Sequence, residues 1–395
     1  MTTTEDLLTR GVEKIYPSKE ELDKVLNKKL RIYQGFDPTS SQLHIGHMVG
    51  LRKLRQWQEL GHEVIFLIGD FTATIGDPTG KDSARVPLTH EEVLKNADTY
   101  KKQASKILRF DGDNPVQIRF NSEWLSKISA SELLKLAGNV THGQLIERDM
   151  FQKRFKGNKD VYLSELLYPV MQAYDSVHMD VDVEVGGSDQ TFNMLMGRKL
   201  MRNITKKEKF VMTLPLLTVD GEKKMGKSEG NAIGIADEPS DLYAEIMALG
   251  DDVIVKGFEY LTDVDMNEVR QIAEDLKGGK NPITYKKMLA FEIVKQLNSH
   301  DLAHKSQEDF EKTVQNKEMP EKISYYRTEN EKMRLEDILV VSKLAESKSE
   351  SKRKIEQGGV DIDGENITDP NRIVQFKEGM TIRAGRRFVK INWTP

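Results

Sequence analysis

One stretch of this sequence constrains the fold more than any other, because a strand, a turn, a helix and a second strand follow each other within it. Residues 30–36 indicate a buried strand, and residues 37–40 (Asp-Pro-Thr-Ser) are typical of a turn. A helix is expected from about residue 43 to residue 60, with Gly61 ending it, and residues 63–68 form a second apolar run. Strands joined through a helix run parallel in one sheet, so this unit predicts the first half of a doubly wound α/β fold.

The rest of the chain divides into further parts. Residues 5–27 indicate a leading helical segment. Further strands are expected near residues 116–120, 181–185 and 209–217, with a helix at residues 162–176. We expect a Rossmann-type domain at residues 1–222, a lysine loop with a helical domain at 223–317, a polar linker at 318–332 and a small α+β unit at 333–395.

Composition excludes several classes of protein. The chain has 395 residues, a net charge of −4 and no cysteine, so disulfides and cysteine metal sites are excluded. No apolar run approaches the roughly 20 residues that a membrane-spanning helix needs. The first residues carry no basic or apolar targeting pattern, so we expect a cytoplasmic protein.

A motif at the start of the 43–60 helix indicates phosphate chemistry. In His44-Ile45-Gly46-His47 the two imidazoles lie three residues apart on one helix face, where backbone N–H groups and the helix dipole favour an anion. Gly46 would let a flat ligand group approach the backbone. The alternative is purely structural: the histidines would cap or pack the helix start.

A second motif, Lys224-Met225-Gly226-Lys227-Ser228, offers two ammonium groups and a hydroxyl that suit a departing pyrophosphate. Taken alone, it could equally be a solvated surface loop. Residues 76–81 (Gly-Asp-Pro-Thr-Gly-Lys) are similar to a P-loop but lack its first glycine and its final Ser or Thr. We expect a loop there in which Lys81 and Arg85 reach phosphates and Asp77 faces an amine.

A polar stripe adds to the candidate pocket. Tyr168, Gln172 and Asp175 are spaced to share one face of the helix expected at residues 162–176. Such a stripe is more often a half-exposed polar face, but it could form a pocket wall that accepts an amine or a hydroxyl. Asp189-Gln190 follows a glycine pair at a strand end, which is where doubly wound folds bind ligands.

These pieces, in this order and over nearly the full length, resemble the bacterial tyrosyl-tRNA synthetases, which belong to the class I aminoacyl-tRNA synthetases. The most specific run is residues 33–39 (Tyr-Gln-Gly-Phe-Asp-Pro-Thr), which leads into the first histidine motif. The resemblance implies a Rossmann-type doubly wound parallel sheet, a helical domain and a small α+β S4-like RNA-binding domain. It also implies that L-tyrosine and ATP give tyrosyl-adenylate and pyrophosphate, and that the tyrosyl group then passes to the 3′ end of tRNA(Tyr).

The resemblance assigns a role to each matching side chain. Tyrosine would be held by Tyr33, Asp77, Tyr168, Gln172, Asp175 and Gln190, with Tyr33 and Asp175 on the phenol. ATP would face Asp37, Thr39, Gly46, Asp189, Lys227 and Ser228. The phosphates would be held in the transition state by His44, His47, Lys81, Arg85, Lys224 and Lys227. Departures from the usual family pattern are Gln34, Gly50 and Gly226, where several relatives carry cysteine, threonine and serine respectively.

Partners and cofactors follow from the same resemblance. Mg²⁺ would arrive with ATP, held by phosphates and water, and no metal cage built by the protein is expected. Two basic clusters in residues 333–395 would contact the tRNA backbone through Lys352, Arg353, Arg383, Arg386 and Arg387. Family members are homodimers, so a homodimer is expected here, with no membrane partner.

Three alternatives remain open. A tryptophanyl synthetase would share the fold and both phosphate motifs but has no need of an aspartate for a phenol, so Tyr33 and Asp175 count against it. A nucleotidyltransferase of the cytidylyl or adenylyl type also uses a His-x-Gly-His turn but would lack the Tyr168 helix and the S4-like tail. A non-catalytic RNA-binding relative would be expected to have lost phosphate-site residues, and this sequence keeps them.

Overall fold

The computed structural model describes residues 2–79, 88–219, 223–225, 231–315, 324–345, 347–385 and 387–394. The chain forms two compact units, Met1–Ala303 and His304–Pro395, and each is described by itself. Within the described residues, no helix is both long enough and apolar enough to cross a membrane.

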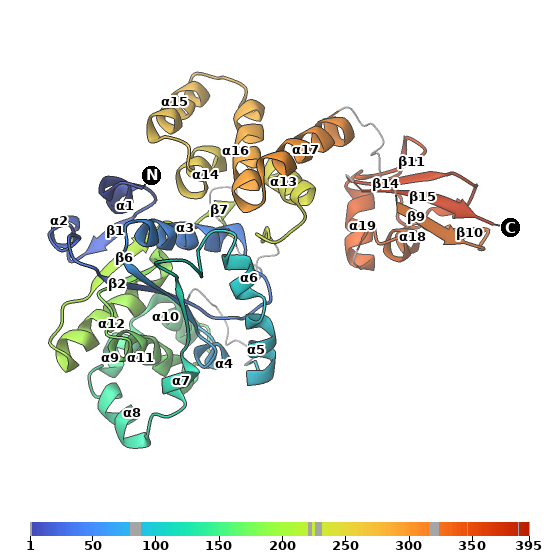
Figure 1. Cartoon of the computed structure of the whole chain (residues 1–395). Coiled ribbons are helices and arrows are strands. Elements are labelled where there is room, and N and C mark those ends of the chain that lie inside the picture. The colour runs from blue at the N-terminus through green and yellow to red at the C-terminus, as the bar shows by residue number, and fades with distance from the viewer. Residues whose placement is uncertain are drawn as a thin grey trace. The chain divides into compact units, whose positions relative to one another are not determined.

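A six-stranded sheet in the order β1-β6-β5-β2-β3-β4 forms the centre of the first unit (Figure 1). Its strands are β1 (Lys14–Tyr16), β2 (Arg31–Phe36), β3 (Glu63–Ile68), β4 (Gln117–Phe120), β5 (Val183–Gly187) and β6 (Phe210–Leu214). Neighbouring strands pair in parallel, except that β1 runs antiparallel to β6 at one edge. The expectation of a doubly wound parallel sheet is therefore confirmed.

Helices surround this sheet and continue beyond it. Those that precede β1 or connect the strands are α1 (Thr4–Thr9), α2 (Lys19–Asp23), α3 (Ile45–Glu59), α4 (Thr72–Ile75), α5 (His90–Ala97), α6 (Tyr100–Ala104), α7 (Ser122–Leu125), α8 (Ala130–Ala137), α9 (His142–Ile146), α10 (Asp149–Lys156), α11 (Leu163–His178), the 3₁₀ turn η1 (Ser188–Gln190) and α12 (Thr191–Ile204). A short hairpin, β7 (Thr218–Val219) and β8 (Lys223–Lys224), precedes α13 (Pro239–Met247), α14 (Val253–Leu261), α15 (Met266–Lys277), α16 (Pro282–Leu297) and α17 (His300–Phe310).

Apolar side chains on both faces of the central strands explain why the sheet is covered on both sides. Tyr33, Ile65 and Leu67 pack in one cluster with residues of α11 and α12. Side chains alternate along a strand, so the neighbours of these residues face the opposite side, where α3 contacts β2, β3 and β5. Figure 1 shows α11 and α12 on one side of the sheet and α3 on the other.

The order of the strands creates a switch point. From β2 the chain passes through α3 to its neighbour β3 and then to β4, and it returns to β5 on the other side of β2. The connections that leave β2 and β5 therefore diverge at the carboxyl ends of these strands. In doubly wound sheets this divergence opens the crevice that holds a ligand.

The leading segment differs from the helix that the sequence predicts for residues 5–27. It forms α1, then the edge strand β1, then α2. Gly11 adopts a positive φ of 59° just after α1, and Pro17 follows β1 directly, so neither position favours a continuous helix. Lys14 to Tyr16 pair instead with the edge of β6.

The second unit contains a five-stranded sheet in the order β12-β11-β14-β15-β9 and a small β10-β13 pair. Its elements are η3 (Glu311–Gln315), β9 (Ser324–Thr328), β10 (Lys332–Arg334), α18 (Leu335–Val341), α19 (Lys348–Glu356), β11 (Val360–Ile362), β12 (Glu365–Asn366), β13 (Ile373–Gln375), β14 (Thr381–Ala384) and β15 (Arg387–Trp393). Its core includes Leu335, Ile338 and Ile355 from the helices and Ile382 and Ile391 from the sheet.

The polar linker predicted at residues 318–332 differs from what the structure shows in its described part. Residues 324–328 form β9, which pairs in parallel with β15. Tyr326, in the middle of β9, packs against the core of the second unit. The segment is polar because an edge strand has one exposed face, on which every second side chain meets water. A polar composition is therefore as compatible with such a strand as with a linker.

Three cations, one just after α1 and two on α3, connect separate parts of the first unit. Lys53 is buried on α3 and donates to the carbonyl oxygens of Leu7, at 2.9 Å, and Arg10, at 2.8 Å, at the end of α1. Arg10 in turn donates to carbonyl oxygens at the end of α14, and Arg52 forms an ion pair with Asp263 at 2.6 Å. Cations at the carboxyl ends of helices satisfy carbonyl groups that the helix leaves unpaired.

Lys53 gives this unit a testable pH dependence. Burial, followed by the nearby Arg10 and Arg52 charges, lowers the pKa of Lys53 from 10.5 to about 7. Between these values the unfolded chain binds more protons than the folded chain, so this lysine makes stability rise as pH increases from 7 towards 10. We predict that Lys53→Met reduces the rise in thermal midpoint between pH 7 and pH 9, measured by scanning calorimetry.

The control for this prediction is Lys29→Met, because Lys29 is exposed. Its pH dependence should match that of the wild type. A Lys53→Met protein whose midpoint rises with pH as steeply as the wild type would contradict the assignment.

Candidate active site

A cavity of about 980 Å³ opens at the carboxyl ends of β2 and β5. It is the position that the strand order singles out as the ligand crevice. The cavity brings together many residues that the sequence pointed to. These are Tyr33, Asp37, Thr39, His44, Gly46, His47, Asp77, Tyr168, Gln172, Asp175, Asp189 and Gln190.

The histidine motif forms the first turn of α3. His44 is the N-cap residue, and its backbone N–H donates to Nδ1 of His47 at 3.1 Å. Because this nitrogen accepts, the proton of a neutral His47 imidazole resides on Nε2, where it can be donated to an anion. The two rings lie close, with centroids 3.8 Å apart. A β-carbon on Gly46 would lie 2.9 Å from the His44 ring, so any other residue there would displace the ring.

The chain on both sides of the lysine motif is anchored next to these histidines. The β7–β8 hairpin pairs Thr218 with Lys224, and buried Met225 donates its backbone N–H to Leu217 at 2.9 Å. After the motif, residues 233–235 pair with residues 43–45 through backbone hydrogen bonds of 2.9 and 3.0 Å. The strand-like contacts therefore tether the motif to the turn that carries His44.

At the other end of the cavity, Asp175 is held by two donors. Trp124 donates its indole N–H to one carboxylate oxygen at 2.8 Å, and Asn121 donates to the other at 3.2 Å. Burial raises the pKa of Asp175 well above its usual value, and these two hydrogen bonds oppose the rise. The second lone pairs of both oxygens remain as acceptors at the cavity wall, where Asp175 is buried.

Hydrogen bonds also link the residues on either side of the pocket. The Tyr168 hydroxyl donates to Asp37 at 2.8 Å, and Thr72 donates to the other oxygen of Asp37 at 2.8 Å. On a separate wall, Gln190 donates to Asp77 at 2.6 Å. Burial, together with the negative charges of Asp37 and Asp77, raises the pKa of Tyr168 well above its usual value, so this phenol stays protonated.

A buried ion pair lies at the pocket wall, where Glu184 lines the cavity and Lys209 does not. Lys209 and Glu184 are both almost completely inaccessible and form a close salt bridge. Lys209 also donates to the Ser176 hydroxyl at 2.8 Å, and that hydroxyl lies 2.8 Å from the hydroxyl of Tyr33. Burial lowers the pKa of Lys209, whereas the charge of Glu184 opposes that change.

Among the described residues, no three His, Asp or Glu side chains form a group that could hold a metal ion. The cavity carries acceptors at the Asp175 end and imidazole donors at the His44 end. Such an arrangement can bind a molecule that has a hydroxyl at one end and a negatively charged group at the other.

Some predicted residues cannot be placed. Lys81, Arg85, Lys227 and Ser228, with Gly226, lie outside the described residues, as does Arg386 in the second unit. The backbone of Lys224 is described within β8, whereas its side chain is not. The phosphate-binding roles of these cations therefore stay predictions.

The structure adds residues that sequence reasoning missed. Asn121 lines the cavity and follows β4 directly, so the rule that ligands bind at strand carboxyl ends could have identified it. Glu184 interrupts the apolar run of β5, and Lys209 immediately precedes the apolar run of β6. A charge inside a fully buried strand needs a partner, which is the signal that was available for this pair.

The chain is similar to known proteins over nearly its full length. A family model described as "tRNA synthetases class I (W and Y)" matches residues 24–315, and the S4 domain model matches residues 333–382. The tyrosine–tRNA ligase of Aquifex aeolicus is 41% identical over 391 residues, which is 98% of each chain. That of Haemophilus influenzae is 42% identical over 362 residues, covering 91% of this chain and 89% of the relative.

Solved structures agree with the fold. Tyrosyl-tRNA synthetase from Archaeoglobus fulgidus, complexed with L-tyrosine, matches with a TM-score of 0.60 and 26% identity, covering 76% of this chain and 98% of that one. The C-terminally truncated mitochondrial tyrosyl-tRNA synthetase of Aspergillus nidulans matches with a TM-score of 0.65 and 24% identity, covering 77% and 92% respectively, and supports the fold alone.

Proposed function

The chain belongs to the class I tRNA synthetases for tryptophan and tyrosine, and we propose that it is a tyrosine–tRNA ligase. In the proposed reaction L-tyrosine and ATP form tyrosyl-adenylate and pyrophosphate, and the tyrosyl group then passes to the 3′ end of tRNA(Tyr). The observation that carries the choice of tyrosine is the pair of Tyr33 and Asp175 in one cavity. A phenol hydroxyl can donate to Asp175 and pair with Tyr33, whereas the ring of phenylalanine would leave the remaining acceptor capacity of Asp175 unused, at a cost of about 1–3 kcal/mol.

The opposite end of the amino acid would be recognised by acceptors. The carboxylate of Asp77 and the side-chain oxygen of Gln172 line the cavity and suit an ammonium group. Tyr168 would complete this side, held by its hydrogen bond to Asp37. Gln190, which donates to Asp77, would lie near the substrate carboxylate.

The chemistry would depend on orientation and charge rather than on a side-chain nucleophile. The tyrosine carboxylate would attack the α-phosphate of ATP and expel pyrophosphate. His44 and His47 lie at the α3 N-terminus, where imidazole and backbone N–H groups favour the growing negative charge. Lys224 and Lys227, with Lys81 and Arg85, would hold the pyrophosphate. Asp37, Thr39, Gly46, Asp189 and Ser228 would face ATP itself. Holding both substrates in line supplies much of the remaining acceleration.

Magnesium fits this proposal as a companion of ATP. It would be held mainly by the phosphates and water, which is how Mg²⁺ commonly binds in nucleotide sites. Its contribution would be to neutralise phosphate charge. An enzyme that charges tRNA is expected in the cytoplasm, where translation takes place.

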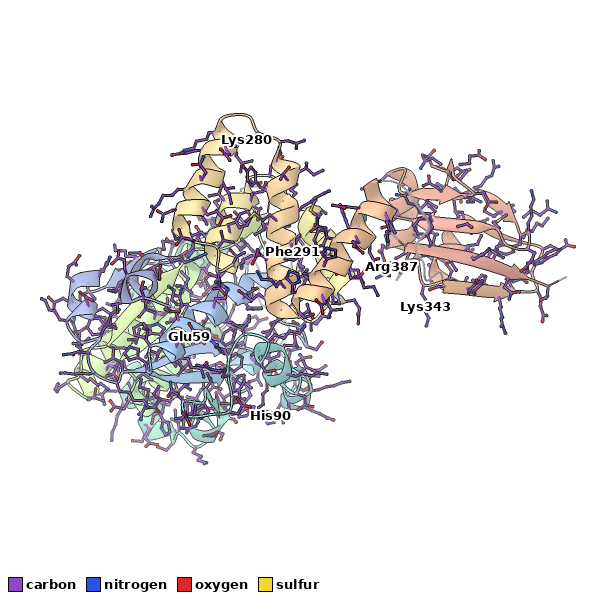
Figure 2. All side chains as sticks on the ribbon, turned by 45° about the horizontal axis from the view of Figure 1, so that its top comes forward. Glu59, His90, Lys280, Phe291, Lys343 and Arg387 are labelled. Atoms are coloured by element: carbon purple, nitrogen blue, oxygen red, sulfur yellow. The ribbon has the colours of Figure 1, made fainter. Side chains whose placement is uncertain are left out.

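The second unit would bind tRNA. On α19, Lys352 and Arg353 are exposed, and Lys352 makes only a loose pair with Glu356 at 3.9 Å. Arg387, which Figure 2 labels, is exposed at the start of β15. Arg383 is less available, because it forms an ion pair with Asp361 at 3.2 Å. Exposed cations of this kind bind a phosphate backbone and release counterions.

We also propose a homodimer. Exposed apolar side chains occur on neighbouring helices of the first unit: Leu134 on α8, Phe155 on α10, and Tyr162 and Leu163 at the start of α11. An apolar surface of this kind commonly mediates protein–protein contact.

Analytical ultracentrifugation should show twice the chain mass for the wild type and a shift towards the monomer for Leu163→Asp. A wild type that stays monomeric at micromolar concentration would contradict the dimer.

The role of Asp175 can be tested by steady-state pyrophosphate exchange. Asp175→Ala removes the acceptor for the phenol, so the KM for tyrosine should rise on the order of 100-fold, while the KM for ATP should change by less than roughly twofold. The variant should also lose its preference for tyrosine over phenylalanine. Equal losses for both substrates would argue against this role.

The tRNA role can be tested in the full-length chain. The double variant Lys352→Glu/Arg353→Glu should lower tRNA(Tyr) charging at least tenfold and reduce its salt dependence, while leaving pyrophosphate exchange unchanged. The matched control is Lys28→Glu/Lys29→Glu, since these exposed lysines precede β2 and so lie at the opposite end of the sheet from the cavity. Charging at the wild-type rate by the α19 variant would overturn the assignment.

A further inference from the structure

The Lys209–Glu184 pair has no part in the reaction as proposed, although its burial is costly. Both side chains are at most 3% exposed. Taking two charges out of water costs several kcal/mol per ion, and an apolar pair of the same size is often at least as stable. Such a pair is therefore poorly explained by stability alone. Its contacts point to a different role.

Both partners reach the amino-acid pocket. Glu184 accepts a hydrogen bond from the Gln172 side-chain nitrogen at 3.1 Å through the oxygen that does not face Lys209. Lys209 donates to Ser176, whose hydroxyl contacts Tyr33. Gln172, Tyr33 and Glu184 itself line the cavity, whereas Lys209 lies behind them and contacts them through Glu184 and Ser176.

The charge of Glu184 decides which way the Gln172 carboxamide points. A carboxylate can only accept hydrogen bonds, so the NH₂ group of Gln172 must face it. The Gln172 oxygen is consequently turned away, and it finds no hydrogen-bond partner among the described residues, although it is buried. An acceptor without a partner, on a residue that lines the cavity, suits a donor supplied by the ligand.

We propose that the Lys209–Glu184 pair positions Gln172 for substrate recognition, so that the Gln172 oxygen rather than its NH₂ group meets the ammonium group of the amino acid. This inference rests on the proposed function. Lys209 holds the Glu184 side chain in place, since its ammonium group bonds to one carboxylate oxygen and leaves the other to accept from Gln172.

The surrounding chain keeps room for this arrangement. Gly197 on α12 lies next to the Lys209 ammonium group, with which a β-carbon at that position would collide. The same β-carbon would lie 3.0 Å from the Ser176 hydroxyl and 3.3 Å from Glu184. A glycine in mid-helix is less stable than an alanine would be, so the buried pair is accommodated with a further loss of stability.

The decisive variant is Glu184→Gln. Lys209 would still hold the oxygen at its side of the new amide, so the new NH₂ group would face Gln172 and donate to it. Gln172 would then turn its own NH₂ group towards the substrate ammonium. The KM for tyrosine in pyrophosphate exchange should rise roughly 10- to 100-fold, the range of a lost hydrogen bond to a charged group. The KM for ATP should stay within about twofold.

A second variant separates positioning from folding. In Glu184→Gln/Lys209→Met no cation holds the new amide in the wrong orientation, and the Ser176 hydroxyl, 3.3 Å from the Glu184 oxygen that Lys209 contacts in the wild type, can donate or accept. The KM for tyrosine should therefore fall back part of the way to the wild-type value. KM does not depend on the fraction of enzyme that is folded. Loss of stability alone therefore cannot raise the KM in the single variant and lower it again in the double variant. The double variant also removes the unpaired buried charge.

The chain offers a matched control on α11, the helix that carries Gln172. Glu165 on α11 forms another deeply buried pair, with Arg154 at 2.7 Å, and neither residue lines the cavity. Glu165→Gln should leave the KM for tyrosine unchanged within about twofold, as expected when no substrate contact depends on the substituted pair.

Two tyrosine analogues locate the effect. Tyramine keeps the ammonium group, so its inhibition constant should rise in Glu184→Gln as much as the KM for tyrosine. The desamino analogue 3-(4-hydroxyphenyl)propionate lacks that group, so its inhibition constant should not change.

An unchanged KM in Glu184→Gln, a double variant no better than the single one, or an equal rise for both analogues would overturn the inference. A wild type without tyrosine-dependent exchange would instead reject the proposed function, and this inference with it.

Discussion

The parting of β2 and β5 at their carboxyl ends is the constraint on which the rest of the first unit depends. It follows from the order of the strands, since the chain leaves β2 through α3 on one side and returns to β5 on the other. The gap places the α3 N-terminus, with His44 and His47, opposite the polar face of α11. Backbone groups and imidazoles thus gather at one end, and the acceptors of Asp175 at the other.

The pocket between these ends is built from buried polar groups. Because they are shielded from water, their hydrogen bonds and charges act more strongly on a ligand. Two of them are held by partners inside the protein: Asp175 by Trp124 and Asn121, and Tyr168 by Asp37. In a desolvated site a fixed acceptor discriminates strongly, because a ligand without the matching donor leaves it unpaired. Selectivity for a phenol and an ammonium group would therefore arise from groups whose orientation is settled before the substrate enters.

Local patterns in the sequence predicted the sheet and much of the cavity, since apolar runs, turn residues and helix spacing decide them. They failed where distant segments decide the outcome. The pairing of β1 with β6 and of β9 with β15 turned an expected helix and an expected linker into edge strands. Lys209 and Glu184 escaped notice because they lie 25 positions apart, and only the β5–β6 pairing brings them together. The roles of Lys224 and Lys227 stay predictions, since only the backbone of Lys224 is described and Lys227 lies outside the described residues.

The most direct test of the central claim, that the cavity selects tyrosine and joins it to ATP, is pyrophosphate exchange by the purified wild-type chain. Tyrosine, phenylalanine and tryptophan would each be offered at the same concentration with ATP and magnesium. The account predicts exchange with tyrosine and little with the other two. Exchange with tryptophan would keep the phosphate site but contradict the roles of Tyr33 and Asp175, and no exchange with any of them would contradict the proposed activity itself.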